Sequence, residues 1–389
     1  MTLRVLHVTA SLCPKAGGTT TAVQQMVKIL SSKGVKCDIA ATIDRDCMSL
    51  QDWSDFKEYS IDIHLFPRRL DYYSYAPSMA KWLGSNIQNY DLVHIHGLFS
   101  YVNGLASRIA QRKNIPYVVT PHGMASRYGM RHKAFLKNLS FNLIERTLLT
   151  RSAAIHFTSK IESEEFGDLG IAVNQFRIPL AVKPLVRGSE ERFFEKYPSL
   201  IDSEIIYFLG RIDPIKNIEL LISGFLLTAQ TRARSRLVIS GAGKKEYVIR
   251  LKKMLKQSNL DGKVVWTGHL NAQEKEDALS VADVLVMPSK SESFGLSVVE
   301  ALSVGVPCVL TTGVALSDEI DDAAVGVKVE PNPASVSEGI SRGLSLSNSC
   351  NSFSRTALKF VETHFSEESV SREIVRMYRL CVHSNFVDE

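Results

Sequence analysis

The chain alternates short β-rich runs with helical patterns, and this alternation narrows the choice of fold more than any other feature of the sequence. Strands that are separated by helices pair in parallel, because each helix carries the chain back to the same end of the sheet. We therefore expect a parallel sheet with helices on both faces. The predicted strands are 3–10, 36–42, 61–66, 91–96, 116–121 and 153–157, and the predicted helices are 19–33, 76–89, 101–112, 132–150 and 159–167.

The same alternation begins again in the second half of the chain. Between the halves, three prolines and the charged run Glu190-Glu191-Arg192 favour a linker over 179–203. A length of 389 residues also suits two domains that each bury a core. The second set of predicted strands is 204–209, 235–240, 263–267, 283–287, 307–310 and 324–329, with helices at 217–230, 244–258, 271–281, 295–304 and 333–346.

These patterns predict an α/β chain of two doubly wound domains, at 1–182 and 183–365, followed by a helical segment at 366–389. Two such domains in series bring the carboxyl ends of both sheets to a shared crevice, which is where open α/β folds bind ligands. The last helix either caps the second domain or crosses back to the first, and the sequence leaves both arrangements open.

Positive charge is concentrated in the first half of the chain. The formal net charge is +5, but residues 1–180 hold 21 Lys and Arg against 14 Asp and Glu, whereas 181–389 hold 25 against 27. Segment 124–151 is basic and amphipathic, with Glu145 as its single acid. Such a segment either contacts an anionic membrane or lipid-linked substrate, or packs as a helix with a solvated basic edge. No nucleic-acid-binding motif accompanies it, so no nucleic-acid partner is expected.

Targeting signals are absent from the sequence pattern. Arg4 and His7 interrupt the apolar N-terminus, which we interpret as a first strand and not as a signal peptide. The most apolar later stretch, 296–316, is broken by Glu300 and Pro307, so no membrane span is expected. The six cysteines form no CxxC pair, which favours a reducing cytosol. We expect a cytoplasmic protein that contacts the inner membrane face only if its basic segment binds anionic lipid.

Two glycine-rich turns follow predicted strands. Gly17-Gly18-Thr19 comes after the first strand and opens a helix, so its backbone N–H groups and the helix dipole can face an anion. Gly241-Ala242-Gly243-Lys244 follows a strand of the second domain. Neither matches a GxGxxG or GxxxxGK[ST] phosphate loop, and a plain turn remains the alternative for each.

The most informative stretch is 287–302, where a strand ends, a polar loop follows and a helix begins near Gly295. At 1.5 Å per residue, Glu300 lies about 7 Å along the helix axis from Gly295. Glu292 and Glu300 can therefore mark the two ends of an extended ligand, while free N–H groups of 294–296 face an anion between them. This layout suits a nucleoside diphosphate sugar, because hydroxyls donate to carboxylates and phosphates accept from amides.

Two cations precede a helix at the start of the second domain. Arg211 and Lys216 follow its first strand and are separated by five positions. Arg can bind two phosphate oxygens as a fork and Lys adds a point charge, so together they can neutralise a leaving diphosphate. Taken without the other motifs, such a pair is also common at the protein surface.

Histidines follow or occupy strands of the first domain. His122 ends a strand within Thr120-Pro121-His122-Gly123, where it either plays a structural role or donates to a sugar hydroxyl near the reacting carbon. His94 and His96 lie on one face of a strand, but no acid or cysteine partners them, so no metal site is expected.

Taken together, four elements make the chain resemble the retaining glycosyltransferases of family 4, which have GT-B architecture with two Rossmann-like domains. The elements are Gly17-Gly18, His122-Gly123, Gly210-Arg211 with Lys216, and the block from Glu292 to Glu300 that contains Phe294-Gly295-Leu296. Their order and spacing agree with the family across nearly the whole chain, and the Glu-x7-Glu block is the most specific of them.

The resemblance implies a division of roles around the donor. Arg211 and Lys216 would hold its diphosphate, helped by the backbone of Gly17 and Gly18 and of the N–H groups at 294–296. Glu300 would bind the ribose, and Glu292 the transferred sugar, which His122 would approach from the first domain. The nucleobase would rest near Gly241 and the turn Thr267-Gly268-His269-Leu270.

The resemblance also implies the type of reaction. A hexose would pass with retained configuration from a UDP- or GDP-sugar to a glycan or lipid-linked acceptor in polysaccharide biosynthesis, by same-face attack and without a protein nucleophile. Orientation and diphosphate stabilisation would then supply most of the barrier reduction. No cofactor and no metal are implied, so Asp44-Arg45-Asp46 is interpreted as a loop. Acceptor contacts are assigned by position alone to Phe99, Tyr101, Arg127 and Tyr128.

Two positions depart from the family pattern. Asn217 stands where glycine frequently follows the lysine, and Ser240-Gly241-Ala242-Gly243 lacks the acid common after its first glycine. The second departure leaves the preferred base and sugar open. Two alternative functions stay under consideration, a nucleotide-sugar epimerase of the same architecture and a protein that binds sugar nucleotide or glycan without turnover.

Overall fold

The computed structural model describes residues 2–13, 18–43, 54–127, 130, 139–347 and 350–384. The chain divides into two compact units. The first comprises Met1–Ala181 together with Glu367–Glu389, and the second comprises Val182–Ser366. The last helix of the chain therefore belongs to the first unit.

The first unit is built on a seven-stranded sheet in the order β3-β2-β1-β4-β5-β6-β7, with every pair parallel. The order reverses between β1 and β4, where Thr9 lies opposite His96. All residues of β4, β5 and β6 are buried, as expected of strands covered on both faces. The strands are β1 (Arg4–Thr9), β2 (Lys36–Ile43), β3 (Ile63–Pro67), β4 (Leu92–His96), β5 (Tyr117–Thr120), β6 (Ala154–Phe157) and β7 (Gln175–Arg177).

Helices connect these strands, and several begin where the sequence offers a capping residue. The side chain of Ser100 accepts a hydrogen bond from the amide of Asn103, and that of Ser159 accepts one from Glu162. The helices are α1 (Gly18–Ser32), α2 (Ser54–Glu58), α3 (Pro77–Asn86), α4 (Tyr101–Arg112), α7 (Arg146–Thr150), α8 (Lys160–Gly167) and α17 (Glu367–Ser384), with 3₁₀ turns η3 (Tyr72–Ser74) and η4 (Ile87–Asn89) and a π-helical turn η5 (Phe141–Glu145).

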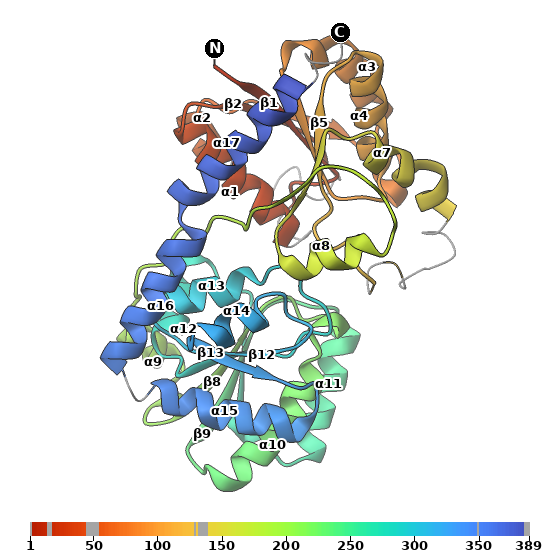
Figure 1. Ribbon diagram of the computed structural model, residues 1–389. Coiled ribbons are helices and arrows are strands. Elements are labelled where there is room, and N and C mark those ends of the chain that lie inside the picture. The colour runs from red at the N-terminus through yellow and green to blue at the C-terminus, as the bar shows by residue number, and fades with distance from the viewer. Residues whose placement is uncertain are drawn as a thin grey trace. The chain divides into compact units, whose positions relative to one another are not determined.

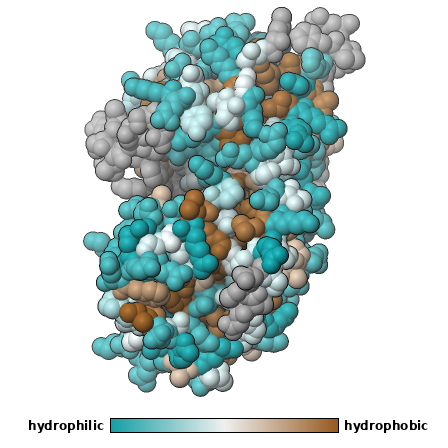
Figure 2. Space-filling view, turned by 90° about the vertical axis from the view of Figure 1, so that its left-hand side faces the viewer, coloured by the Kyte–Doolittle hydropathy of each residue, from teal (hydrophilic) through white to brown (hydrophobic). Residues whose placement is uncertain are grey.

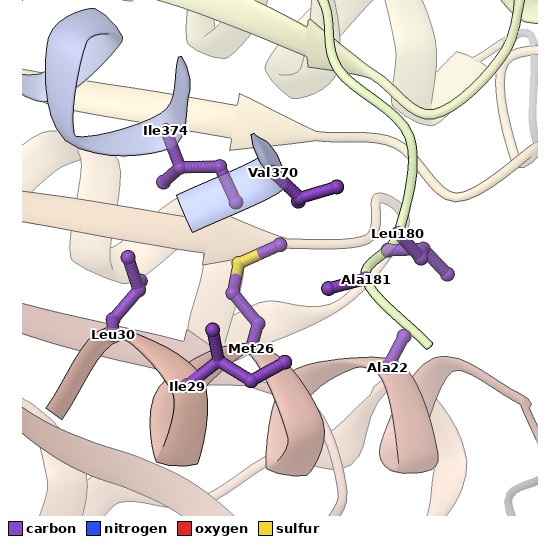
Figure 3. Close-up of a pocket in the computed structure, with 8 residues that line it drawn as sticks. All are labelled: Ala22, Met26, Ile29, Leu30, Leu180, Ala181, Val370 and Ile374. Carbon is purple, nitrogen blue, oxygen red and sulfur yellow. The ribbon is translucent and has the colours of Figure 1, made fainter. Parts of the chain in front are cut away.

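Helix α17 packs against α1 within the first unit (Figure 1). The side chains that meet there are all apolar, and Figure 3 shows Met26 of α1 pointing between Val370 and Ile374 of α17. They enclose a cavity of only about 10 Å³, so this is a packing contact and not a ligand site. Burial of this apolar face stabilises the return of the C-terminal helix to the first unit.

The second unit repeats the architecture with six parallel strands in the order β10-β9-β8-β11-β12-β13. Helices α10 and α15 lie side by side on it (Figure 1). The strands are β8 (Glu204–Leu209), β9 (Ser235–Ser240), β10 (Val264–Gly268), β11 (Val284–Met287), β12 (Cys308–Thr311) and β13 (Gly326–Val329). The helices are α9 (Glu190–Lys196), α10 (Ile218–Thr231), α11 (Lys245–Gln257), α12 (Ala272–Ser280), α13 (Leu296–Ser303), α14 (Ser317–Asp322), α15 (Pro333–Ser347) and α16 (Cys350–Phe365), with 3₁₀ turns η6 (Pro198–Leu200), η7 (Pro214–Lys216) and η8 (Asp261–Lys263).

The predicted fold class is confirmed, since two parallel Rossmann-like sheets are present. The chain passes from the first unit to the second at Ala181 and Val182, inside the predicted linker 179–203, but the charged run of that segment is not a linker because it forms α9. Ser189 caps this helix, and the guanidinium of Arg192 donates to both oxygens of Asp277 in α12, at 3.0 and 2.7 Å. Strand β7 and helices α2, α14 and α16 were not predicted.

The predicted helix at 132–150 is only partly described. Its described end is a π-helical turn, η5, that continues directly into α7. Residues 131–138, which carry several of the basic side chains of segment 124–151, lie outside the described residues, as does Asp44-Arg45-Asp46.

None of the described helices is both long and apolar enough to cross a membrane. The face of the molecule in Figure 2 is mainly hydrophilic, with hydrophobic residues in small groups. Cys37, Cys308 and Cys381 are free and buried.

Candidate functional site

The loops at the carboxyl edge of the second sheet are joined through their backbones. Strands β8 and β11 are neighbours where the strand order reverses, which is the usual ligand position in such sheets. The amide of Lys290, after β11, donates to the carbonyl of Ile215, after β8, at 2.8 Å. The amide of Glu292 donates to Gly313 at 2.9 Å, and the amide of Ala315 donates to Glu292 at 2.9 Å. Two neighbouring loops, after β8 and after β12, therefore hold the segment from Lys290 to Glu292 in place.

Lys216 and Glu292 form an ion pair across two of these loops. Their side chains are only 15% and 19% exposed, so the pair is largely shielded from solvent. Lys216 is positioned by the η7 turn, in which the carboxylate of Asp213 accepts from the amide of Ile215 at 3.1 Å. A cation and a carboxylate of the predicted site thus lie in direct contact although 76 positions separate them.

Asn217 explains one departure from the family pattern. It adopts a left-handed backbone with φ of 54° and ψ of 44°, between η7 and α10. Glycine is the residue most tolerant of this conformation, and Asn tolerates it better than other residues with a Cβ. Asn217 therefore preserves the turn that presents Lys216.

Helix α13 begins beside this pair. Gly295 precedes it with φ of 92°, and no side chain caps its first turn, so the first N–H groups of the helix can meet an anion. Phe294 is buried and packs edge-on against Phe365, at 5.6 Å between ring centroids, which fixes the loop before the helix. Leu296, the first residue of α13, is partly buried.

Glu300, on α13, forms an ion pair with Lys275 of α12. The exposed fractions of the two side chains are 13% and 25%. Lys275 was not predicted as a site residue, because only the fold brings α12 against α13. A second residue missed is Ser289, whose buried hydroxyl has no partner among the described residues and lies in the same loop as Lys290.

The glycines after β8 and β9 allow the neighbouring loop backbones to approach closely. A Cβ on Gly241, whose φ is 142°, would lie 1.8 Å from the carbonyl oxygen of Gly210. The amide of Gly241 donates to Gly268 at 2.7 Å, which connects the β9 loop to the turn that follows β10. His269 in that turn is exposed and Leu270 is partly buried. The structure thus brings together the predicted nucleobase residues at one edge of the sheet.

The structure says less about the remaining predicted site residues. Arg211 is exposed. Gly18 is the first residue of α1, while Gly17 and Tyr128 lie outside the described residues. Arg127 is paired with Asp168 at 2.7 Å, so it is not free for an acceptor unless this exposed pair opens.

His122 lies in the first unit, directly after β5. It has a left-handed backbone with φ of 52°, and Gly123 follows with φ of 74°. The amide of Gly123 donates to the buried carboxylate of Glu162 at 2.6 Å, and Glu162 also accepts from the amide and hydroxyl of Thr158. Glu162, which was not predicted, therefore fixes the unusual turn that carries His122.

A cluster of four further histidines of the first unit adjoins His122. His96 packs against His122, His7 and His94 pack against His96, and His156 lies beside His94. Burial lowers the pKa of His7 and His122 to about 3 and that of His156 to about 4, and it holds the pKa of His94 and His96 well below the usual range. These imidazoles are neutral at neutral pH. Nitrogen atoms of His7, His94 and His96 lie within 4.8 Å of one another, a spacing at which a metal ion could be considered.

Comparison with known proteins covers both units. A family profile described as "Glycosyl transferase 4-like domain" matches residues 17–181, and one described as "Glycosyl transferases group 1" matches 189–360. An uncharacterized glycosyltransferase of Methanocaldococcus jannaschii is 25% identical over 98% of this chain and 99% of its own length. The α-monoglucosyldiacylglycerol synthase of Streptococcus pneumoniae is 24% identical over 83% of this chain and 74% of its own.

Solved structures agree on the fold. Anabaena HepE, solved in complex with UDP and glucose, superposes with a TM-score of 0.79 over 97% of this chain and 99% of its own, at 14% identity. The two profiles match the two units in turn, and the paired Rossmann-like sheets have the architecture of that structure. The chain belongs to the group 1 glycosyltransferases, family 4, which have the GT-B fold.

Proposed function

We propose that this glycosyltransferase transfers a hexose, with retention of configuration, from a nucleoside diphosphate sugar to a glycan or lipid-linked saccharide. The observation that supports this most strongly is the assembly of Lys216, Glu292 and the uncapped start of α13 at the carboxyl edge of the second sheet. A cation next to a helix N-terminus suits a diphosphate, and a carboxylate beside them suits the hydroxyls of the sugar.

In this proposal the diphosphate takes over one partner of the ion pair. Lys216 turns from Glu292 to a phosphate oxygen, and Arg211, which is exposed, adds a second cation. Glu292 then accepts from a sugar hydroxyl. As the bond between sugar and phosphate breaks, negative charge grows on the diphosphate, and the cations and the helix N–H groups stabilise it in the transition state. No protein nucleophile is required by this scheme.

The ribose and base are assigned to neighbouring elements of the same edge. Glu300, oriented by Lys275, would accept from the ribose hydroxyls. The turn with His269 and Leu270 and the backbone of Gly241 would support the base. UDP and GDP both fit this assignment, and the structure of HepE with UDP supports the uridine form.

The first unit is assigned to the acceptor and to His122. We place Phe99 and Tyr101, which flank the start of α4, among the acceptor contacts. The name of the diacylglycerol-modifying relative from Streptococcus pneumoniae supports a lipid-linked acceptor. Peripheral contact with an anionic membrane through segment 124–151 remains part of the proposal.

The test is acceptor-dependent turnover by the purified full-length chain. UDP- and GDP-hexoses are offered with and without a panel of glycan and lipid-linked acceptors, and nucleoside diphosphate release is measured together with the anomeric configuration of the product. We expect release from one donor only when an acceptor is present, and a product with retained configuration. Lys216→Ala and Glu292→Gln should each lower kcat by about 100-fold, equivalent to about 2.7 kcal/mol.

A matched control is Lys328→Ala. Lys328 forms a partly exposed ion pair with Asp318 in the same unit and is not among the predicted donor residues, so its loss should change kcat by less than about twofold. Full activity in both site variants would refute the proposed donor site. Conversion of the donor sugar without acceptor would favour an epimerase, and donor binding without turnover on any acceptor would favour a binding protein.

A further inference from the structure

Three buried or partly buried imidazoles form a continuous chain that ends at His122. Nδ1 of His7, on β1, lies 3.0 Å from Nε2 of His96, on β4. Nδ1 of His96 in turn lies 3.1 Å from Nε2 of His122, after β5. His7 and His96 are at most 1% exposed. His7 and His96 lie on the adjacent strands β1 and β4, and His122 follows the next strand, β5, so the fold itself sets their contacts.

Each ring in this chain is neutral, because burial holds all three pKa values far below neutral pH. A neutral imidazole has one N–H donor and one bare nitrogen. A chain of such rings has only two consistent proton arrangements: either every ring donates toward His122, or every ring donates toward His7. The tautomer of His122 is therefore coupled to the tautomers of His96 and His7.

His94 does not take part in this chain of hydrogen bonds, because its two nitrogens bind Tyr378 and Thr120. The carbonyl of Ile178 can only accept, so Nε2–H of His156 donates to it at 2.7 Å, and the bare Nδ1 accepts from the hydroxyl of Thr120 at 2.9 Å. Thr120 then accepts from Nε2–H of His94 at 2.7 Å, and Nδ1 of His94 accepts from the hydroxyl of Tyr378 at 2.6 Å. This second network has a single direction.

These hydrogen bonds also argue against a metal ion among the histidines. A metal held by His7, His94 and His96 would need a bare nitrogen from each ring. His94 offers its bare nitrogen to Tyr378, and both nitrogens of His96 are engaged by His7 and His122, so neither ring has a bare nitrogen free for a metal.

The unpartnered nitrogen of His7 decides in which direction the three imidazoles donate their protons. Nε2 of His7 is buried and has no partner among the described residues. A buried N–H without an acceptor is rarer and more costly than a buried lone pair without a donor. His7 therefore keeps its proton on Nδ1 and donates to His96, and His96 donates from Nδ1 to Nε2 of His122.

We propose that His96 and His7 are positioning residues that hold His122 as the tautomer with its proton on Nδ1. This tautomer presents an N–H donor, and not a lone pair, to the ligand. It gives His122 the role of donating to a hydroxyl of the sugar, and this part rests on the proposed function. The side chain of a free neutral histidine in water is protonated mainly on Nε2. Protonation of His122 on Nδ1 would therefore show that His96 and His7 position it.

The first test reads the tautomer without any substrate. Full-length protein labelled with ¹⁵N in histidine is studied by NMR at about pH 7.5, where these rings are neutral. We expect His122 to have a protonated Nδ1 and a bare Nε2. His96→Phe, which removes the donor, should shift His122 to the Nε2-protonated or averaged form, whereas His96→Asn, which keeps an N–H near the position of Nδ1, should preserve it. An Nε2-protonated His122 in the unmodified protein would overturn the proposal.

The second test uses turnover. His96→Phe should lower kcat by at least about 10-fold with little change in the KM for the donor, and His96→Asn should restore most of it. If His96→Phe fails to fold, His7→Phe serves instead. Without the donor His7, the proton of His96 can move from Nδ1 to Nε2. The control is His64→Phe, on β3 of the same sheet, whose ring packs on Trp82 and not on the chain. A wrong transferase assignment leaves the NMR result unchanged, whereas kcat equal in His96→Phe and His64→Phe would refute the positioning role.

Discussion

Glu145 is a fully buried carboxylate at the end of the π-helical turn η5. One oxygen accepts from the amide of Phe99 at 3.1 Å and lies near the hydroxyls of Tyr73 and Ser140, and the other has no partner among the described residues. Burial, the largest cause, raises the pKa of Glu145 from 4.5 to about 7. The protonation state of Glu145 therefore affects the hydrogen bond that holds the backbone of Phe99 in the loop before α4.

This pKa predicts an unusual pH dependence. The folded state keeps the proton of Glu145 up to about pH 7, whereas the unfolded state releases it near pH 4.5. Its contribution to the free energy of unfolding thus falls as pH rises through this window, by at most about 1.4 kcal/mol per pH unit. Glu145→Gln should raise Tm relative to the unmodified protein at about pH 8 more than at about pH 5. An equal difference at both pH values would contradict the prediction.

Asn217 allows a second prediction at a single position. Because its φ is positive, Asn217→Gly should leave the free energy of unfolding within about 0.5 kcal/mol, whereas Asn217→Val should lower it by about 1–2 kcal/mol. Urea denaturation of the three proteins measures both effects. If Val were tolerated as well as Gly, the left-handed turn at Lys216 would not be required.

Helix α17 is held to the first unit by apolar packing, by a buried hydrogen bond and by an exposed ion pair of Glu368 with Lys33. The hydroxyl of Tyr378 donates to Nδ1 of His94 at 2.6 Å, and both residues are fully buried. Tyr378→Phe should lower the free energy of unfolding by about 1–2 kcal/mol, because the nitrogen of His94 is left without a donor. The control is Leu380→Ala, on the exposed side of the same helix, with a change below about 0.5 kcal/mol. Equal effects in chemical denaturation would argue against the bond.

The regular elements were predictable where a pattern was long and repeated. All twelve predicted strands are present, and α4 begins and ends at the predicted residues. Strand β7 has three residues and α14 has six, which are too few for a periodic pattern to show. The helix α9 was missed because its charges and the prolines on either side of it suggested a linker, and its contact with Asp277, which is distant in sequence, could not be seen from the local pattern.

The site was predictable in its residue types but not in its contacts. Lys216, Glu292 and Glu300 could be identified from motifs on separate loops. Their partners depend on which loops the strand order brings together, so the pairing of Lys216 with Glu292 and of Glu300 with Lys275 required the fold. Likewise, His94 and His96 were noticed as a pair, but their division between two hydrogen-bond networks depends on His7, Thr120 and Tyr378.

The molecule as a whole carries five neutral, buried or partly buried histidines in its first unit, and these predict sensitivity to acid. Each has a pKa far below 6.5 in the folded state, so the unfolded state takes up protons that the folded state does not. The free energy of unfolding should fall as pH drops from about 6.5 toward 4, by up to about 1.4 kcal/mol per pH unit for each histidine.

Proton uptake during unfolding at about pH 5.5, measured in weakly buffered urea, tests this directly. We expect an uptake of several protons in the intact chain and about one fewer in His156→Phe. An uptake near zero would mean that these histidines are already charged in the folded protein.

The central claim is that the carboxyl edge of the second sheet binds the diphosphate of a sugar nucleotide through Lys216. Calorimetric titration of the full-length chain with UDP, GDP and the corresponding nucleosides tests it most directly. We predict that one diphosphate binds at least about 10-fold more tightly than its nucleoside, and that Lys216→Ala removes most of this difference while Lys328→Ala leaves it unchanged. The same preference for the diphosphate in Lys216→Ala and in the unmodified protein would contradict the account.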